Sequence, residues 1–346
     1  MASEWSLPDE DLVLASALVG DDAWRHLDGA RVLVTGGTGF VGKWLLASAL
    51  HATRSLSVAT ELVVLSRDPE GFAAINPELA SAVTLVRGDV RDFEMPPGGF
   101  THVVHGATEV AAARTPMDTF DVTVRGTKHV LECAIAQGAR DVLFVSSGAV
   151  YGPQPAKMPA IPESYLGVPP VGSPASAYGE GKRVAEWLTR LGADDGLRTR
   201  VARCFAFVGP YLPLDGSFAI GNFIADALDG RPVAVRGDGT AQRTYLYAAE
   251  LAGWLWAMLL RGPAGSTYNI GGEEVVSMAV LASRVDNLLG SGMGVHLAEE
   301  PRPGAAPDRY VPDVSNIRRD LGLPDPVPLD DAIARTASWH RTWRNR

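Results

Sequence analysis

The chain has 346 residues and carries 31 basic against 40 acidic side chains, which gives a formal net charge of −9. This balance argues against a nucleic-acid-binding protein, which needs a clustered basic surface to neutralise phosphates. A small anionic ligand is still compatible, because a few well-placed arginines can bind one diphosphate. The hydrophobic share of 46% and charged share of 21% are typical of a globular protein and argue against a disordered chain.

The first 28 residues are acidic and contain neither a basic start nor a long apolar run, so no signal peptide is expected. We predict a helical extension over residues 1–28. The apolar segment 249–260 is too short to span a bilayer and is expected to be a buried helix. Cys133 and Cys204 lack metal-ligand spacing and are expected to be free thiols, and the histidines form no cluster. The sequence therefore predicts a cytoplasmic protein without a bound metal.

From Arg31 onward, short apolar runs alternate with helical stretches. Strands are predicted at 31–36, 61–66, 82–89, 101–107 and 141–147, and helices at about 40–51 and 117–137. Apolar strands that are separated by helices indicate a parallel sheet covered on both faces. The expected fold is α/β, a Rossmann-type doubly wound parallel sheet, whose ligand crevice lies at the carboxyl ends of the strands.

The pattern changes after Tyr151. A loop rich in proline and glycine is predicted over 152–175, followed by a helix to Leu191 and a strand over 198–209. From Pro210 onward short elements and loops alternate, which indicates a smaller C-terminal substrate-binding lobe. We therefore expect residues 29–209 to form the dinucleotide-binding domain, with residues 210–346 mainly in the lobe and some segments returning to the sheet.

The segment 35–42, TGGTGFVG, joins the first strand to the first helix of this domain. Gly37, Gly39 and Gly42 fit G-x-G-x-x-G, while Gly36, Gly39 and Gly42 fit G-x-x-G-x-x-G. Glycine permits a tight turn and a close approach of backbone N–H groups to a pyrophosphate. The helix N-terminus adds further donors and a favourable dipole. The sequence therefore predicts a bound dinucleotide.

The end of the second strand helps to select the dinucleotide. An acidic residue there binds the ribose hydroxyl of NAD, whereas arginine accommodates the 2′-phosphate of NADP. Ser66 takes the usual acid position and Arg67 follows it, which favours NADP, although Arg67 can equally stack on adenine or cap the loop. Asp89 is either an adenine contact or a turn residue. The expected cofactor contacts are Gly36, Gly39, Phe40, Val41, Gly42, Ser66, Arg67, Asp89, Val90, Ala107 and Lys182.

Tyr178 and Lys182 stand four residues apart on a predicted helix and so share a face. A free phenol, with a pKa of about 10, is a poor base at neutral pH. The ammonium group and a positively charged nicotinamide ring would lower that pKa, so Tyr178 can take a hydroxyl proton while hydride leaves the same carbon. Ser147, at the end of a strand, can hydrogen-bond the same oxygen.

These motifs resemble the extended short-chain dehydrogenase/reductase family, in its nucleotide-sugar epimerase/dehydratase branch, over about residues 31–321. The resemblance rests on TGGTGFVG, HGAT, VSSGAVYG, YGEGK, RCFAFVGPY, GDGTAQRTYLY and PRPG. It implies a catalytic triad of Ser147, Tyr178 and Lys182, with NAD as the usual cofactor. It also implies a nucleotide-diphosphate sugar bound by Asn222, Arg243 and Arg302. Family members often form homodimers through the helices after the fourth and fifth strands; apolar residues around 130–135 and 184–191 fit such a homodimer and fit core packing equally well.

Two departures from the family restrict the reaction. Family 4,6-dehydratases carry an Asp-Glu pair after the Ser/Thr position, and related decarboxylases keep a glutamate there, whereas this chain has Gly148-Ala149. Ala206 and Thr123 also replace common asparagines, so some ligand contacts must differ. Elimination of water is therefore not expected.

Two reactions need only serine, tyrosine, lysine and a nicotinamide. The sequence favours a nucleotide-diphosphate-sugar 4-epimerase that acts by transient oxidation at C4, with Tyr178 as acid/base. The alternative is an NADPH-dependent 4-ketoreductase of an NDP-4-keto sugar. Less favoured are a 4,6-dehydratase and a non-catalytic dinucleotide-binding protein, since a fold alone does not establish activity.

Overall fold

A seven-stranded parallel sheet forms the centre of the computed structural model, which describes residues 6–108, 115–216, 218–290, 292–302 and 304–343. Its strand order is β3-β2-β1-β4-β5-β6-β11. The strands are β1 (Ala30–Thr35), β2 (Thr60–Ser66), β3 (Thr84–Arg87), β4 (His102–His105), β5 (Asp141–Ser147), β6 (Arg198–Cys204) and β11 (Thr267–Ile270). This confirms the predicted doubly wound Rossmann-type fold. The order reverses between β1 and β4, where such sheets form their ligand crevice.

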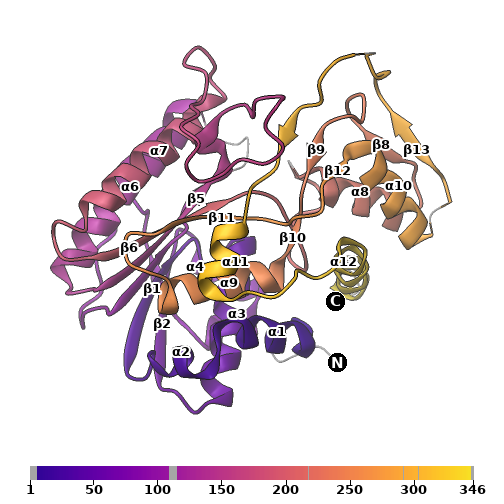
Figure 1. Cartoon of the computed structure of the whole chain (residues 1–346). Coiled ribbons are helices and arrows are strands. Elements are labelled where there is room, and N and C mark those ends of the chain that lie inside the picture. The colour runs from indigo at the N-terminus through magenta and orange to yellow at the C-terminus, as the bar shows by residue number, and fades with distance from the viewer. Residues whose placement is uncertain (1–5, 109–114, 217, 291, 303, 344–346) are drawn as a thin grey trace.

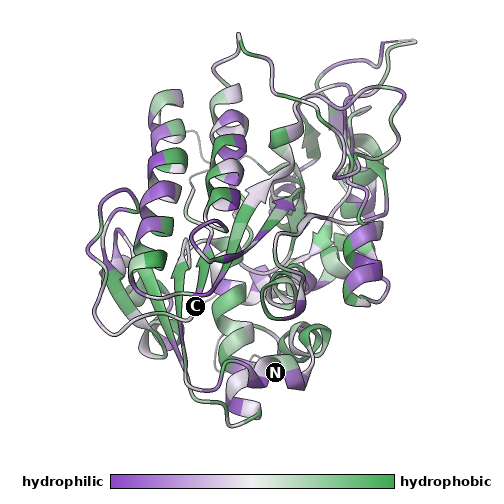
Figure 2. Cartoon of the chain, turned by 60° about the vertical axis from the view of Figure 1, so that its left-hand side comes forward, coloured by the Kyte–Doolittle hydropathy of each residue, from purple (hydrophilic) through white to green (hydrophobic). Residues whose placement is uncertain are grey.

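Helices cover both faces of the sheet, as the apolar strands require. In β1, Val32 and Val34 pack against the helices on one face of the sheet. Leu33 packs on the opposite face with Val130 and Leu131. The helices of the first face are α1 (Asp9–Val19), α3 (Phe40–Ser55) and α9 (Ala248–Arg261). The opposite face carries α6 (Pro116–Ala136) and α7 (Ser176–Leu191), which run side by side (Figure 2).

The N-terminal segment is helical and packs into the core. It forms α1 and α2 (Asp21–Arg25), and Trp24 contacts Trp256 of α9 with ring centroids 5.4 Å apart. The fully buried carboxylate of Asp11 accepts hydrogen bonds from Tyr247 and Arg335, each 2.6 Å long. Because a buried carboxylate is costly unless it is paired, these bonds fix α1 against both α9 and the C-terminal helix.

The C-terminal part combines a small lobe with elements that return to the sheet (Figure 1). A two-stranded pair, β8 (Val233–Val235) and β13 (Val295–Leu297), packs with α8 (Ala219–Leu228) and α10 (Met278–Leu289). A second small sheet contains β12 (Val276–Ser277), β9 (Gln242–Arg243) and β14 (Arg309–Tyr310). In contrast, β11 pairs with β6 at the edge of the main sheet. No helix in the described part of the chain is long and apolar enough to cross a membrane.

The segment predicted as one strand over 198–209 is divided in the structure. The strand β6 ends at Cys204, and the backbone N–H of Phe205 then donates to Ile270. A short strand β7 (Phe207–Val208) follows and pairs with β10 (Leu246–Tyr247) rather than with the main sheet. The single-strand prediction is therefore wrong after Cys204, and the break turns Phe205 and Ala206 towards the crevice described below. The remaining elements are α4 (Pro69–Ile75), α5 (Pro77–Ser81), a 3-10 turn η1 (Gly148–Tyr151), α11 (Ser315–Leu321) and α12 (Leu329–Trp343).

Candidate active site

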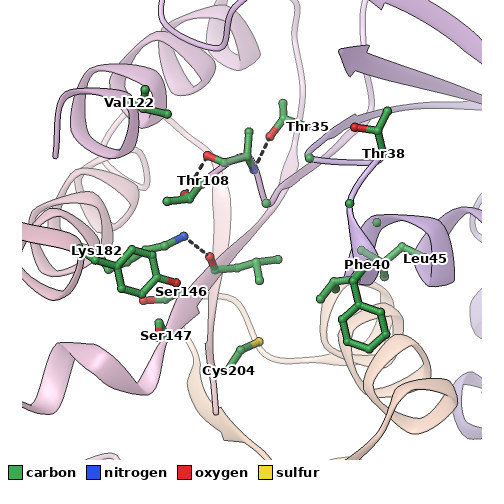
Figure 3. Close-up of a pocket in the computed structure, with 18 of the residues that line it drawn as sticks. Thr35, Thr38, Phe40, Leu45, Thr108, Val122, Ser146, Ser147, Lys182 and Cys204 are labelled. Atoms are coloured by element: carbon green, nitrogen blue, oxygen red, sulfur yellow. Dashed lines mark hydrogen bonds between the residues drawn. The ribbon is translucent and has the colours of Figure 1, made fainter. Parts of the chain in front are cut away.

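A cavity of about 710 Å³ opens at the carboxyl ends of β1, β2, β4, β5 and β6. Figure 3 shows Ser147, Lys182 and Cys204 on one side of it and Thr38, Phe40 and Leu45 on the other. All the predicted catalytic and cofactor residues line this one cavity: Gly36, Gly39, Phe40, Val41, Gly42, Ser66, Arg67, Asp89, Val90, Ala107, Ser147, Tyr178 and Lys182. The structure thus brings together residues that lie far apart in the sequence.

The glycine turn between β1 and α3 closes on itself so tightly that side chains cannot enter it. Gly36 has a φ of +76°, and a Cβ there would lie 2.7 Å from the carbonyl carbon of Gly106. A Cβ on Gly42 would lie 2.2 Å from the Gly36 oxygen. Gly39 precedes α3 without any side-chain cap, so the first N–H groups of this 16-residue helix face the cavity end of the turn. Such a cradle, at a positive helix terminus, fits the pyrophosphate of a dinucleotide.

The end of β2 offers no carboxylate to this cavity. Asp68, the nearest acid, accepts a 3.1 Å hydrogen bond from the Gly71 N–H and caps α4. Ser66 and Arg67 line the cavity instead, and the Ser66 hydroxyl accepts the Asp68 N–H at 3.2 Å. The polar groups available to a ribose here are therefore a hydroxyl and a guanidinium.

Asp89 is the only residue with a carboxylate among the described residues that line the cavity. It forms an ion pair with Arg91, whose Nε lies 2.8 Å from Asp89 Oδ1. Arg91 also contacts Asp121 at 3.0 Å, and these carboxylates raise the pKa of the guanidinium. Asp89 lies beyond β3, at the β2–β3 end of the sheet, whereas Ser147 ends β5. No acid in the described lining therefore belongs to the Ser147 end.

Three groups meet at the end of β5. The Ser147 hydroxyl accepts the Ala149 N–H at 3.1 Å, and Ser147 lines the cavity together with Tyr178. Lys182 is buried, donates a 2.7 Å hydrogen bond to the Val145 carbonyl, and holds its ammonium 5.9 Å from the Tyr178 ring centre (Figure 3). The helix spacing therefore places phenol and ammonium on the same face, directed at the strand end that carries the serine.

The ionisation of this group differs from the sequence expectation. In the protein alone, burial raises the pKa of Tyr178 to about 12, and the Ser147 hydrogen bond opposes this shift. Burial lowers the pKa of Lys182 to about 8. The phenol is therefore neutral near pH 7, because burial removes the hydration that would stabilise a phenolate. A further positive charge in the cavity would be needed to lower the pKa of Tyr178 so that the phenol can act as a base near pH 7.

The cavity and its lining agree with a family whose model the chain matches. Residues 32–271 match the model of the NAD dependent epimerase/dehydratase family. The chain belongs to this family. The match confirms the resemblance seen in the motifs, and it makes the chain an enzyme of the NAD-dependent nucleotide-sugar epimerase/dehydratase group, in which named relatives catalyse several different reactions.

Individual relatives span those reactions. UDP-glucuronic acid decarboxylase 6 of Arabidopsis thaliana is 31% identical, over 88% of this chain and 86% of its own length. The solved dTDP-glucose 4,6-dehydratase of Streptomyces venezuelae, with NAD bound, is 28% identical with a TM-score of 0.75, covering 91% of this chain and 98% of that chain. A UDP-glucose 4-epimerase of Thermotoga maritima shares the fold at 22% identity and a TM-score of 0.76, covering 90% and 99%.

The family's substrate residues are not gathered in the same cavity. Arg243 lies at its border: the guanidinium is 5.9 Å from the ring centre of Tyr310, a lining residue, and donates a 2.6 Å hydrogen bond to Asp308. Asn222 lines a second cavity, of about 820 Å³, and donates to the Gly216 carbonyl at 3.3 Å. Arg302 lines neither cavity.

The second cavity nevertheless adjoins the first, because Leu212 and Pro213 line both. It lies against α8 and α12, and its cations include Lys43, whose ammonium sits 4.1 Å from the Tyr211 ring centre. Burial lowers the pKa of Lys43 to about 8. A ligand that extends from the first cavity past the 212–213 segment would therefore meet Asn222 and charged side chains of both signs, namely Lys43, Arg231 and Arg236 beside Asp215, Asp226 and Asp229.

Several side chains of the first cavity were not assigned to the site from the sequence, among them Cys204, Phe205 and Tyr310. Cys204 is buried at the end of β6, and burial raises the pKa of its thiol to about 12, so it is a neutral, apolar wall. Tyr310 reaches the site because β14, which lies shortly after the PRPG motif, pairs with β9 at the end of GDGTAQR, a long-range contact that no local pattern encodes. The only sequence signal for Tyr310 was its position near one of those two motifs.

The described residues contain no group of three or more histidine, cysteine, aspartate or glutamate side chains that could hold a metal ion. His105 lies beneath the cavity, with Nδ1 2.7 Å from the Thr35 hydroxyl and Nε2 2.9 Å from the Thr127 hydroxyl. Burial lowers its pKa to about 3. This neutral imidazole joins β4 to β1 and to α6, and so supports the floor of the site.

Proposed function

We propose that the protein is a nucleotide-diphosphate-sugar 4-epimerase that oxidises C4 transiently with a bound nicotinamide cofactor. The observation that carries the proposal is the content of the cavity. Ser147, Tyr178 and Lys182 lie together at one end of the cavity. Asp89, at the other end, is the only carboxylate among the described residues that line the cavity. These groups can move one proton at a sugar hydroxyl, but this end of the described lining holds no carboxylate for a further elimination step.

The space beside Ser147 supports the same choice. A Cβ on residue 148 would lie 2.6 Å from the Tyr310 hydroxyl oxygen and 2.8 Å from the Phe205 ring, so glycine is the residue that fits. Ala149 also carries no titratable group. Dehydration and decarboxylation in the family use acidic side chains at these two positions, and this site has no room for one at 148. We therefore do not assign either reaction, although relatives named for both are similar to the chain.

In the proposed reaction, Tyr178 takes the proton from the sugar C4 hydroxyl and later returns it. Ser147 holds that hydroxyl and the phenol oxygen in line, and the Lys182 ammonium stabilises the phenolate. A dinucleotide whose pyrophosphate is bound by the glycine cradle would supply, through its nicotinamide, the acceptor and donor of the hydride. Phe205 and Cys204 line the same end of the cavity with apolar surface, which limits water at the reacting carbon. Inversion follows when the 4-keto sugar turns before the hydride returns.

We assign the diphosphate of the substrate to Arg243, Arg302 and Asn222. Arg243 stands beside Tyr310 at the border of the first cavity, and its bond to Asp308 involves an aspartate that is 68% exposed. An exposed ion pair is worth little, so a diphosphate can displace Asp308 at small cost. Asn222 lies where the two cavities adjoin, which is the direction in which a nucleotide would extend.

A specific observation favours a second candidate, the NADPH-dependent 4-ketoreductase. The lining at the end of β2 contains Ser66 and Arg67 and no carboxylate, a composition that suits a 2′-phosphate. The family description and the NAD-containing relative support NAD for the epimerase. The two proposals thus differ in the cofactor, NAD or NADPH, and in its fate. The epimerase regenerates its cofactor in each turnover, whereas the reductase consumes it.

One experiment separates them. Purified protein without added cofactor is incubated with UDP-glucose, UDP-glucuronate and dTDP-glucose, and the products are resolved by chromatography and NMR at C4. The epimerase proposal predicts exchange between the two C4 isomers of at least one nucleotide sugar. No exchange, together with stoichiometric oxidation of added NADPH by a 4-keto nucleotide sugar, would contradict it and establish the reductase.

We also propose a homodimer through the outer face of α6 and α7. These helices lie side by side (Figure 2), and this pair exposes four large apolar side chains, with Met117 74%, Ile135 39%, Trp187 59% and Leu191 41% exposed. Exposed apolar patches commonly mark interfaces. Trp187→Glu is expected to convert the protein from dimer to monomer in sedimentation analysis; a monomeric wild-type protein would contradict the assignment.

A further inference from the structure

An apolar surface lies beside the serine of the proposed active site. Ser147 pairs in register with Cys204 on the neighbouring strand β6, and the next two residues of the chain also line the cavity. The turn after β5 adds one more small side chain. We call these four lining residues the apolar wall: Ala149, Cys204, Phe205 and Ala206.

The backbone of the wall is already hydrogen-bonded within the protein. The Ala149 N–H and carbonyl are bonded inside the turn after β5, at 3.1 and 3.2 Å. The Phe205 N–H donates to the end of β11 at 2.9 Å, and the Ala206 carbonyl accepts an N–H of β10 at 3.1 Å. Burial raises the pKa of the Cys204 thiol to about 12, so this side chain is neutral. The wall therefore presents mainly apolar surface to a ligand.

The polar side chains around the wall are largely committed to other contacts or to the reaction. The Ser146 hydroxyl donates to a buried carboxylate of α7 at 2.6 Å. Ser147, Tyr178 and Lys182 are assigned to the C4 oxygen and its proton. Tyr310 adds one further hydroxyl, whose oxygen would lie 2.6 Å from a Cβ placed on residue 148. A sugar with several hydroxyl groups near its reacting carbon would therefore leave some of them unpaired against the wall.

The proposed reaction determines which substituent of the sugar meets the wall. C4 must reach Ser147 and Tyr178, and its ring neighbours are C3, with a hydroxyl, and C5, with the exocyclic carbon C6. Inversion requires the 4-keto ring to present both of its faces to the nicotinamide. The C5 substituent therefore lies on one side of Ser147 before the turn and on the other side after it, and it meets the wall in one of these positions.

We propose that the substrate is a nucleotide-diphosphate 6-deoxyhexose, whose C6 methyl group packs on the apolar wall. A methyl group gains free energy when this contact removes it from water, whereas a hydroxymethyl group would bury a hydroxyl without a partner, and a carboxylate costs more still. A pentose, which lacks C6, would make no contact with the wall. The proposal rests on the proposed function, because it names the substrate class of the same site.

Kinetics with four sugars on one nucleotide test this assignment. C4 isomer exchange is measured with UDP-6-deoxyglucose, UDP-xylose, UDP-glucose and UDP-glucuronate, and the series is repeated on dTDP. We expect kcat/KM for 6-deoxyglucose to exceed that for glucose by about 10–100-fold, the range in which an apolar pocket discriminates against an added hydroxyl. Xylose should fall about fourfold below 6-deoxyglucose, the effect of one buried methyl-sized group. Glucuronate should be the poorest substrate.

Binding to the Tyr178→Phe variant separates this proposal from the proposed function. Calorimetric titration of that variant, loaded with NAD, should rank the four sugars in the same order without turnover. If the ranking appears in binding while the wild-type protein exchanges none of the sugars, the substrate class stands and the epimerase proposal is rejected. If none of the four sugars binds, both proposals are rejected.

Substitutions in the wall test its role directly. Cys204→Ser has nearly the same size and places a hydroxyl beside Ser147, so it should lower the preference for 6-deoxyglucose over glucose by roughly 3–10-fold, the effect of one hydrogen bond. Ala206→Asn introduces the amide that is common in the family and should act in the same direction. Cys204→Ala stays apolar and is the matched control, which should keep the preference. Each value is a ratio of two substrates on one protein, so a loss of folded protein does not affect it.

Three results would overturn the assignment while leaving the epimerase proposal intact. The first is glucose or glucuronate that is bound and exchanged as well as 6-deoxyglucose. The second is a pentose that is bound and exchanged better than 6-deoxyglucose, which would remove the methyl contact. The third is a preference that stays unchanged in both Cys204→Ser and Ala206→Asn, which would mean that the wall does not select the sugar.

Discussion

Tyr178→Phe is expected to lower kcat by about 10²–10⁴-fold, the usual contribution of a general acid–base group. Phenylalanine keeps the ring, which lies 5.9 Å from the Lys182 ammonium, and removes only the hydroxyl oxygen. Proton removal from the sugar hydroxyl would then have no acceptor, since the described lining holds no carboxylate at that end of the cavity. The measurement is the initial rate of C4 isomer exchange at saturating nucleotide sugar.

Binding measurements control for an indirect effect of this change. Cofactor affinity and the thermal midpoint of unfolding should both stay close to wild type, because the glycine cradle and the β5 strand are untouched. The control substitution Tyr165→Phe removes a phenol whose nearest aromatic partner is Tyr151, and this variant should retain full turnover. Near-normal turnover in Tyr178→Phe would exclude the phenol from the mechanism.

Gly42→Ala is expected to weaken dinucleotide binding by roughly 10–100-fold, the equivalent of about 1–3 kcal/mol of strain. The new methyl would stand 2.2 Å from the Gly36 oxygen and 2.4 Å from the Gly37 Cα, both backbone atoms that cannot swing away. The turn must open to admit it, so its N–H groups no longer converge on the pyrophosphate. Calorimetric titration with NAD and NADPH measures the change.

Gly172→Ala is the matched control for this substitution. Gly172 belongs to the exposed part of the loop after β5, where a new Cβ would meet no atom within 4 Å, and it needs no positive φ. The Gly172→Ala variant should bind the cofactor with the affinity of the wild-type protein. If Gly42→Ala also retains wild-type affinity, the glycine turn is only structural and the dinucleotide must bind elsewhere.

The parts of the molecule that local pattern determines could be predicted from sequence. The strands β1 to β5 are apolar runs that pair in one parallel sheet, and their ends carry Ser66, Ala107 and Ser147 into one crevice because parallel strands share a carboxyl edge. The Tyr178–Lys182 spacing places both on one helical face for an equally local reason. These residues therefore converge as expected.

The parts that depend on long-range pairing could not be predicted. Tyr310 enters the site through the pairing of β14 with β9, and Asp11 joins the core through a hydrogen bond to Tyr247, which is distant in the sequence. The balance that sets the pKa of Tyr178 was also beyond reach, because the extent of burial is a property of the folded cavity. The sequence identifies the charged neighbour, Lys182, but not the loss of hydration that raises the pKa of the phenol.

Tyr178 and a dinucleotide held by the glycine turn are proposed to act on the same sugar carbon, and every other assignment depends on this. The most direct test uses a nucleotide sugar carrying deuterium at C4, incubated with the purified protein without added cofactor. We predict a C4 epimer that retains the deuterium at C4, because the hydride leaves and returns within one closed site. An epimer whose C4 deuterium has been replaced by solvent hydrogen would contradict this mechanism.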